Sequence, residues 1–349
     1  MKKTGYVLLL VMAITGMCMF TGCMTGKRQS VSMKENETDQ EEKLKVVSTL
    51  FPYYDFARQI GGEEIDLTMV IPAGMDSHSF EPTPKDMIVI QNADLVLCNG
   101  GEMERWVEQV LEAADSETRE VLCMMDYVDA YEEEIVEGME HTHHEHEELE
   151  LGLLESENEH EHEEQEEDDS LHIEYDEHIW TSPANAILFA GKIGEKLQEI
   201  DPKHADLYKE RCQQLCKELK KLDQEFRDIV DKADQDAIIF ADKFPFRYFA
   251  EEFGLRYYAA FSGCSSDTEP SAKTIAFLID KVKKEKIGAV YYLELSSPRV
   301  AQIIEEETGA KPILFHSCHN VTRKEFDSGI TYLELMRRNE EALKVGLWQ

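Results

Sequence analysis

Short apolar, β-rich runs alternate with helix-periodic stretches from residue 45 to near the end of the chain. The predicted strands are residues 45–50, 65–71 and 93–99, followed by residues 237–242, 255–261, 289–295 and 311–317. Predicted helices begin near Pro52, Pro84 and Glu102, and later ones span residues 245–253, 271–285 and 298–308. Such alternation is typical of parallel sheets covered by helices. We therefore predict the α/β fold class, with two lobes that each contain a parallel-type sheet.

A longer helical pattern separates the two sets of strands. Its apolar positions recur at spacings of three, four or seven residues, and they are Tyr208, Leu215, Leu219, Leu222, Phe226, Ile229 and Ala233. This spacing is the periodicity of an α-helix, and about 30 residues make a rod roughly 45 Å long. We predict one long, rigid helix over residues 201–233, which joins an N-terminal lobe, residues 44–200, to a C-terminal lobe, residues 234–349.

The first residues have the pattern of an export signal. Two lysines precede an apolar stretch at residues 6–20, and small residues follow it directly before Cys23. This order resembles the signal of a bacterial lipoprotein, because the apolar core is too short for a comfortable membrane span. We predict that residues 1–22 are the signal peptide, that Cys23 carries lipid, and that residues 23–43 are a flexible tether. An uncleaved membrane anchor is the alternative.

Negative charge is concentrated in one stretch of the chain. The net charge is −36, and residues 131–177 contain 22 Asp and Glu but no Lys or Arg. An acidic protein of this kind is repelled by phosphate backbones, which excludes nucleic acid as a partner. Apolar side chains are too few in residues 137–170 to offset chain entropy, so a mobile loop is expected there.

The acidic stretch is also rich in histidine. Residues 137–178 hold eight of the twelve histidines of the chain. Imidazole and carboxylate groups attract zinc and neighbouring transition metals. A solvated acidic linker with incidental histidines is the simpler interpretation. We predict instead weak metal capture by His141, His143, His144, His146, His160 and His162.

The remaining cysteines lie outside the predicted signal peptide and the predicted lipidation site. They are Cys98, Cys123, Cys212, Cys216, Cys264 and Cys318. An exported chain can form disulfides, but the sequence does not choose among the many pairings. Cys212 and Cys216 lie one helical turn apart beside the apolar stripe, which favours core positions over a metal site or a bridge.

Two further histidines lie on loops between a predicted strand and a predicted helix. His78 is followed by Thr83 and Pro84, which resemble an N-cap and a first helical position. His178 precedes a similar Ser-Pro pair. Ligands of open α/β sheets bind outside the carboxyl ends of the strands. Both histidines are therefore candidate ligands, with an ordinary hydrogen-bonded loop histidine as the alternative for each.

Four features occur together in this chain. They are the motif GMDSHSFEPTPKD at residues 74–86, the His-rich acidic insertion, the motif DEHIWTSP at residues 176–183, and the long helix that follows. Together they resemble the solute-binding lipoproteins of bacterial zinc and manganese ABC importers, the metal-binding cluster A-I type. The resemblance covers about residues 44–348.

This resemblance implies two α/β lobes joined by a rigid helix, with one metal ion held between them. His78 and His178 match the two ligands of the family's N-terminal lobe. The partner implied is the membrane permease of an ABC importer. The location implied is extracytoplasmic, with a monomer held by lipid on the outer face of the cytoplasmic membrane or its periplasmic side.

The C-terminal lobe departs from the family pattern. Family members carry a His, or in manganese-binding members a carboxylate, just before an F-x-Y pair, where this chain has Asp242 and Lys243. The family's fourth ligand comes from a loop that corresponds to FHSCHN, residues 315–320. We predict Asp242 and His316 as the ligands of this lobe, with His319 and Glu294 as alternates.

The expected cargo is Zn²⁺, because two or three imidazoles with one carboxylate suit zinc. Mn²⁺, which prefers oxygen-rich sites, is the alternative. We predict that the protein is not an enzyme, since the sequence has no HExxH, no G-x-S-x-G and no phosphate loop. A surface metal buffer or adhesin, in which the acidic loop itself carries the function, is the second alternative.

Overall fold

The computed structural model describes residues 42–113, 118–139, 175–265 and 269–348. All of these residues except Glu42 belong to one compact unit. The predicted signal peptide, most of the predicted tether and the predicted lipidation site, Cys23, lie outside the described residues. The same is true of the six histidines assigned to weak capture: His141, His143, His144, His146, His160 and His162. Across the described segments, the structure contains no helix long and apolar enough to cross a membrane.

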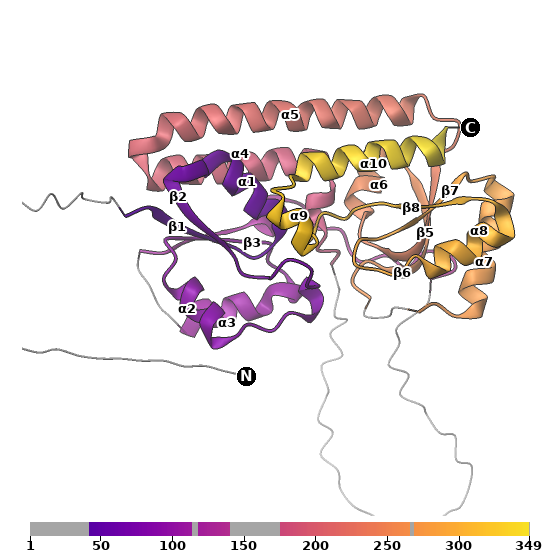
Figure 1. Cartoon of the computed structure of the whole chain (residues 1–349), viewed down its shortest axis with the longest axis horizontal. Helices are drawn as coiled ribbons and strands as arrows, with labels where there is room; N and C mark the ends of the chain where they lie inside the picture. The colour runs from indigo at the N-terminus through magenta and orange to yellow at the C-terminus, as the bar shows by residue number, and fades with distance from the viewer. Residues whose placement is uncertain (1–41, 114–117, 140–174, 266–268, 349) are drawn as a thin grey trace, which may run out of the picture. The chain divides into compact units, whose positions relative to one another are not determined.

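The first part of the described chain forms a four-stranded parallel sheet in the order β2-β1-β3-β4 (Figure 1). Its strands are β1 Leu44–Ser48, β2 Ile65–Met69, β3 Leu95–Cys98 and β4 Glu120–Cys123. Val46 of β1 pairs with Leu67 of β2 on one side and with Leu95 of β3 on the other. All of β3 is buried, as is usual for an inner strand of a parallel sheet. We did not predict β4, which is only four residues long and begins with a charged residue.

The helices of this sheet begin where the sequence predicts. They are α1 Phe51–Gly61, α2 Pro84–Gln91, α3 Arg105–Ala113 and α4 Pro183–Ile200. Thr83 and Asp86 form a capping box at α2, with Pro84 in the first turn, and Ser182 caps α4 in front of Pro183. Short 3-10 turns occur at Gly62–Glu64, Ser77–Ser79, Glu102–Glu104, Met124–Tyr127, Ile179–Thr181 and Pro202–His204.

A second four-stranded parallel sheet in the described residues has the order β6-β5-β7-β8. Its strands are β5 Ala237–Phe244, β6 Arg256–Ser262, β7 Ala289–Tyr292 and β8 Lys311–Leu314. Helices α6 Arg247–Phe253, α7 Ala272–Glu285 and α8 Arg299–Thr308 connect these strands. The register of β5 against β6 shifts between Phe240 and Lys243, so the ladder is irregular at Asp242.

The long helix is α5, Ala205–Asp231, and it contacts α4, α1 and α10. The predicted apolar positions Tyr208, Leu215, Leu219, Leu222, Phe226 and Ile229 form its buried face, and none of them is more than 4% exposed. Ala233 lies beyond the end of the helix and is half-buried. The predicted α/β class, with two parallel sheets and one long helix, is confirmed.

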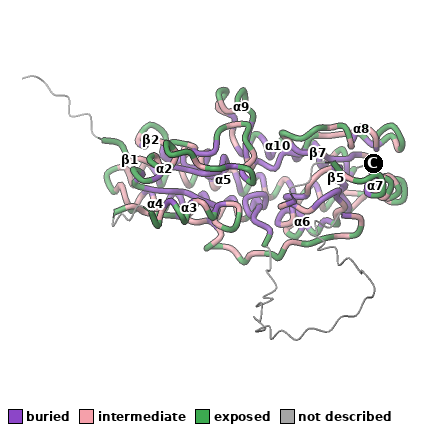
Figure 2. The backbone as a smooth tube through the Cα atoms, turned by 90° about the horizontal axis from the view of Figure 1, so that it is seen from below, coloured by how far each residue is buried: buried purple, intermediate pink, exposed green. Residues whose placement is uncertain are grey.

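The chain ends with α9 Arg323–Asp327 and α10 Tyr332–Leu347, neither of which we predicted. The first residue of α10 contacts the first part of the chain. The Tyr332 N–H donates to Asp55 Oδ2 of α1 (2.8 Å), and the Tyr332 hydroxyl donates to the Trp180 carbonyl (2.8 Å). Figure 2 shows the buried segments inside the molecule and the exposed ones on outer elements such as α7, α8 and α9. The predicted boundaries of the lobes and linking helix stay predictions, because the compact unit continues through them.

Two glycines of α4 test how closely this helix packs against α5. A Cβ atom at Gly194 would lie 2.5 Å from Cys212 Sγ and 2.8 Å from Cys212 Cβ, whereas a Cβ at Gly191 meets nothing within 4 Å. Overpacking costs about 1–3 kcal/mol, and replacing a helical Gly by Ala gains about 1 kcal/mol. We expect Gly194→Ala to lower the free energy of unfolding in urea and Gly191→Ala to raise it. Equal shifts in both variants would contradict this packing.

Candidate metal-binding site

A pocket of about 620 Å³ lies where loops of the two sheets meet. Three imidazoles line it, from His78, His178 and His319. Its other polar lining comes from Asp76, Asp242, Lys243, Glu269, Glu294, Arg299 and serines 296, 297 and 317. The pocket therefore contains both predicted ligands of the first lobe and several candidates from the second.

His78 is held by the 3-10 turn Ser77–Ser79. Asp76 caps this turn, and its Oδ1 accepts the His78 backbone N–H at 2.9 Å. The turn follows β2 and precedes α2, so it lies beyond the carboxyl end of a strand as the sequence predicts. His78 lines the pocket, and the residue as a whole is exposed.

His178 is fixed by the carboxylate two residues before it. Its Nδ1 lies 2.9 Å from Asp176 Oδ1, and its backbone N–H donates to the same oxygen at 2.8 Å. Because the carboxylate accepts the Nδ1–H, the lone pair of Nε2 is left for another partner. Asp176 is therefore a positioning residue that we did not predict, although it is part of the DEHIW motif.

The two Nε2 atoms of His78 and His178 lie 3.3 Å apart. Two nitrogens that bind one tetrahedral zinc at about 2.0–2.1 Å are separated by about 3.3 Å. The pair thus has the spacing of two ligands of a single zinc ion, and it also fits a hydrogen bond between one protonated and one bare nitrogen. In either case, a shared zinc ion or a hydrogen bond, the Nε2 atoms of the two rings face the same point.

A network behind His178 fixes the backbone of its loop. The Glu177 carboxylate accepts the backbone N–H groups of Glu102 and Met103, the latter at 3.0 Å. The Glu177 carbonyl accepts the side-chain N–H of Asn99 at 2.9 Å. The Asn99 amide oxygen in turn accepts the Tyr53 hydroxyl at 2.5 Å. The loop after β3 therefore holds the segment that carries His178.

Gly263, at the end of β6, approaches the other side of His178. A Cβ at this position would lie 3.1 Å from His178 Cε1 and Nδ1 and 3.0 Å from the Phe244 carbonyl oxygen. Only a residue without a side chain fits this approach without displacing the imidazole. We did not predict a role for Gly263, because nothing local in the sequence shows that β6 ends against this loop.

His319 is the histidine of the second lobe that faces the pocket. Its ring centre lies 6.2 Å from that of His78, and its Nε2 accepts the Ser77 backbone N–H at 3.1 Å. The next residue ties the two loops together, since the Asn320 side chain donates to the Pro72 carbonyl (2.8 Å) and the Met75 carbonyl (2.7 Å).

His316 lies away from the pocket lining. Its Nδ1 accepts the Cys318 backbone N–H at 2.9 Å, and its Nε2 is buried without a hydrogen-bond partner. The Asn339 side chain binds both backbone groups of His316, which holds this residue in the interior. The geometry therefore favours His319, which we had named only as an alternate, over His316 as the histidine that can meet His78.

Both predicted carboxylates of the second lobe line the pocket but already accept hydrogen bonds. Asp242 accepts the backbone N–H groups of Lys243 (2.8 Å) and Leu293 (3.2 Å). Glu294 accepts the backbone N–H (2.8 Å) and hydroxyl (2.5 Å) of Ser317. In the described part of the chain, no group of three or more His, Cys, Asp or Glu is placed so that it could hold a metal ion. The close His78–His178 pair is thus the part of the site with metal-ligand spacing.

The protonation of the three imidazoles differs. Desolvation, with the neighbouring His178, lowers the pKa of His78 to about 4. Burial likewise lowers the pKa of His319 to about 4, against the opposing effect of Glu294 and Asp76. Burial also acts to lower the pKa of His178, but the charge and hydrogen bond of Asp176 raise it above its usual value. His78 and His319 are therefore neutral near pH 7, as metal ligands must be.

Comparison with known proteins gives concordant matches. The family model described as "Zinc-uptake complex component A periplasmic" (ZnuA) matches residues 46–346. The high-affinity zinc uptake system protein ZnuA of Bacillus subtilis (strain 168) is 31% identical over 316 residues, which are 90% of this chain and 91% of that protein. The zinc-binding lipoprotein AdcA of Streptococcus pneumoniae (strain ATCC BAA-255 / R6) is 28% identical over 312 residues, 88% of this chain but 57% of AdcA.

Solved structures agree with these matches. The metal-dependent lipoprotein YcdH from Bacillus subtilis aligns with a TM-score of 0.69 and 27% identity, over 88% of this chain and 100% of that chain. The Zn(II)-bound ZnuA-like domain of Streptococcus pneumoniae AdcA aligns with a TM-score of 0.68 and 26% identity, again over 88% and 100%. This chain therefore spans the ZnuA-like part of AdcA and a little over half of its length.

The pKa values predict a distinctive titration in zinc-free protein. We expect the ring signals of His78 and His319 to titrate near pH 4 and those of His178 above the usual value of about 6.5 in NMR spectra. Between about pH 6.5 and pH 4 the unfolded chain binds protons that folded His78 and His319 do not, so these two groups lower stability as the pH falls. His178 acts in the opposite sense, because its stabilising contribution is present below about pH 6.5 and lost as the pH rises through its folded pKa.

Variants His78→Ala and His319→Ala assign the two low-pH signals. Titration of both rings near pH 6.5 would contradict the desolvated site described above.

Proposed function

Because this chain belongs to the family of periplasmic zinc-uptake components, we propose that it captures a zinc ion outside the cytoplasm and delivers it to the permease of an ABC importer. Members of this family are substrate-binding receptors of ABC transporters, not enzymes. The observation that carries the proposal is the 3.3 Å separation of His78 Nε2 and His178 Nε2 inside the pocket.

The ligand set we propose is His78, His178 and His319. His319 reaches the pocket from the second lobe and is neutral near pH 7, which supports it as the third nitrogen ligand. Asp242 and Glu294 each accept two hydrogen bonds already, so a water molecule is the simplest fourth ligand. Three protein ligands with one open position allow zinc to enter and leave more readily than a closed set of four.

Zinc is favoured over manganese by the chemistry of the donors. Three imidazole nitrogens suit zinc, whereas manganese prefers carboxylate, carbonyl and water oxygens. The relatives ZnuA of Bacillus subtilis and AdcA of Streptococcus pneumoniae are described as zinc uptake and zinc-binding proteins, which supports the same choice. Manganese binding remains the alternative that a competition experiment addresses.

We further propose that residues of the acidic insertion supply zinc to the pocket. The described residues at its start pack on α7: Glu137 pairs with Lys281 at 2.8 Å, and Gly138 lies against Phe277. Met139 is 7% exposed. A deletion that spares this anchored edge therefore begins at residue 140, not at residue 137 as the predicted loop boundary suggested.

Alanine variants test the proposed ligands by calorimetry with zinc. We expect His78→Ala, His178→Ala and His319→Ala each to weaken binding by tenfold or more, which is about 1.4 kcal/mol per decade. In each variant the remaining ligands are still desolvated, but the metal has lost one of its bonds, so the free energy of binding is less favourable. His204→Ala, on the turn before α5, is the matched control and should bind normally.

The same measurement separates the alternatives. If His316→Ala weakens zinc binding while His319→Ala does not, the second-lobe ligand is His316, as the sequence first suggested. A chain that lacks residues 140–170 should retain one tight zinc ion. Loss of that ion would favour the metal buffer over the transport receptor, and tighter binding of manganese than zinc would favour the manganese alternative.

We also propose that the mature protein is a monomer anchored by lipid at Cys23. AdcA and YcdH are both described as lipoproteins, which supports this location. A multiply acylated cysteine anchors stably, whereas one acyl chain alone binds a membrane only marginally. We expect Cys23→Ser to release the protein from the membrane fraction in cell fractionation. Retention of the variant in the membrane would support the uncleaved anchor instead.

A further inference from the structure

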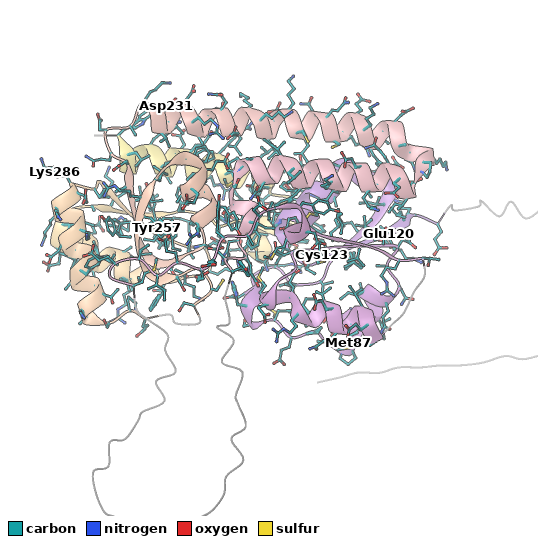
Figure 3. All side chains as sticks on the ribbon, turned by 180° about the vertical axis from the view of Figure 1, so that it is seen from behind. Met87, Glu120, Cys123, Asp231, Tyr257 and Lys286 are labelled. Carbon is teal, nitrogen blue, oxygen red and sulfur yellow. The ribbon has the colours of Figure 1, made fainter. Side chains whose placement is uncertain are left out.

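Two cysteines outside the metal pocket lie side by side at the carboxyl ends of β3 and β4. Cys98 is the last residue of β3, Cys123 is the last residue of β4, and the two are directly paired in the parallel register. Figure 3 labels Glu120 and Cys123, the first and last residues of β4. Paired residues of parallel strands project to the same face, and their Cα atoms lie about 4.8 Å apart, within the range that disulfides span.

The sulfur atoms are closer than the backbone requires. Cys98 Sγ lies 2.7 Å from Cys123 Sγ, which is well inside the separation of two unbonded sulfur atoms. Cys98 is 1% exposed, while Cys123 is partly accessible. By contrast, the Sγ atoms of Cys212 and Cys216 lie 3.9 Å apart on one turn of α5, where each thiol donates to a carbonyl of α4. Cys98 and Cys123 are therefore the pair whose placement fits a bond.

We propose that Cys98 and Cys123 form a disulfide that holds together the frame behind His178. The proposal rests on the proposed function only for the extracytoplasmic location, where disulfides persist. The oxidant is an oxidised thiol–disulfide oxidoreductase. Cys123, the accessible thiol, loses its proton and attacks the oxidant's disulfide. Cys98 then displaces the oxidant from the mixed disulfide, so two protons and two electrons leave the pair and the oxidant departs as a dithiol.

The chemistry around Cys98 disfavours a free thiolate. The shared hydrogen bond with Cys123, burial and the nearby Glu104 carboxyl all raise the pKa of Cys98, and the same hydrogen bond lowers the pKa of Cys123. Glu104 is itself buried, and burial raises its pKa to about 7. A disulfide carries no ionisable group, so like the neutral thiol it places no charge beside this buried carboxyl.

The bond would act on the loop that supports the metal site. It closes a ring from Cys98 to Cys123, which includes residues 99–104 and α3. In that ring, Asn99, Glu102 and Met103 bind Glu177, the residue before His178. β4 lies at one end of the described sheet and has β3 as its strand neighbour. The disulfide would therefore limit local unfolding of β4, the edge strand next to residues 99–104.

Peptide mapping tests the bond in the full chain. Cells that export the protein are quenched in acid, free thiols are blocked with N-ethylmaleimide, and the purified chain is digested with trypsin. Cleavage after Arg105 and Arg119 places the two cysteines on separate peptides. We expect a linked pair of these peptides that separates on reduction. Recovery of both cysteines as maleimide adducts would overturn the proposal.

Thermal unfolding tests the effect of the bond. Dithiothreitol should lower the Tm of the oxidised chain by on the order of 5 °C, because the ring is released. It should have no such effect on Cys98→Ala/Cys123→Ala, and it should still act on the matched control Cys212→Ala/Cys216→Ala. An equal drop in Cys98→Ala/Cys123→Ala would overturn the assignment of the effect to this pair.

Hydrogen exchange adds a readout at the loop itself. We expect the amides of residues 99–104 to exchange faster in reduced chain than in oxidised chain, and unchanged exchange there would overturn the link to the frame of His178. Zinc calorimetry on the same oxidised sample reports the proposed function separately. A chain that binds zinc but has free Cys98 and Cys123 thus rejects the cross-link alone.

Discussion

The hydrogen bond between Asp176 and His178 is the interaction on which the candidate site depends. It holds the imidazole in one tautomer, because the carboxylate accepts the Nδ1–H at 2.9 Å and leaves the Nε2 lone pair toward His78. A buried carboxylate next to a buried imidazole is stable only when both are satisfied. The same Asp176 oxygen also accepts the His178 backbone N–H, so one oxygen fixes both the ring and its main chain.

This local arrangement extends into the rest of the fold. The segment that contains His178 is held from the first sheet by Asn99 and from the C-terminal segment by the Trp180 contacts. The Trp180 indole donates to the Ser317 carbonyl at 2.8 Å, two residues before His319. The Tyr332 hydroxyl donates to the Trp180 carbonyl from the start of α10. Loops from both sheets are therefore joined through one buried aromatic residue, and they reach the pocket as a connected group.

Much of this arrangement could be predicted from the sequence. The strand runs, the caps at Thr83 and Ser182, and the apolar stripe of α5 are local patterns, and each corresponds to an observed element. The placement of His78 on a loop beyond a strand end, and of His178 shortly before a capped helix, followed from the same patterns. β4 was missed although three strands of equal length were predicted, because its apolar run follows directly after the charged residues Arg119 and Glu120. α10 was missed although its sequence carries the signals of a helix, a Thr331–Glu334 capping box followed by a periodic apolar face.

The choice between His316 and His319 could not be made from the sequence. The two histidines are three residues apart, and the turn between them has Cys318 at a positive φ of 63°. That turn, together with Asn339 bound to the backbone of His316, directs one ring inward and the other to the pocket. Non-glycine residues adopt this conformation rarely, and the contacts that impose it come from α10, far along the chain. Tertiary contacts, not local preference, decide which ring faces the pocket.

The hydrogen bond from the Ser77 N–H to His319 Nε2 has a kinetic consequence. The lone pair of His319 Nε2 binds one partner at a time. Zinc that binds this nitrogen must therefore displace the N–H of Ser77, the residue next to His78. The displaced Ser77 N–H stays close to His319 and can form the hydrogen bond to Nε2 again. If zinc binds this nitrogen, as we propose, the Ser77 N–H competes with it at high effective concentration and favours its release. A carrier that must surrender its cargo benefits from such built-in reversibility, because tight capture and rapid hand-over then use the same atom.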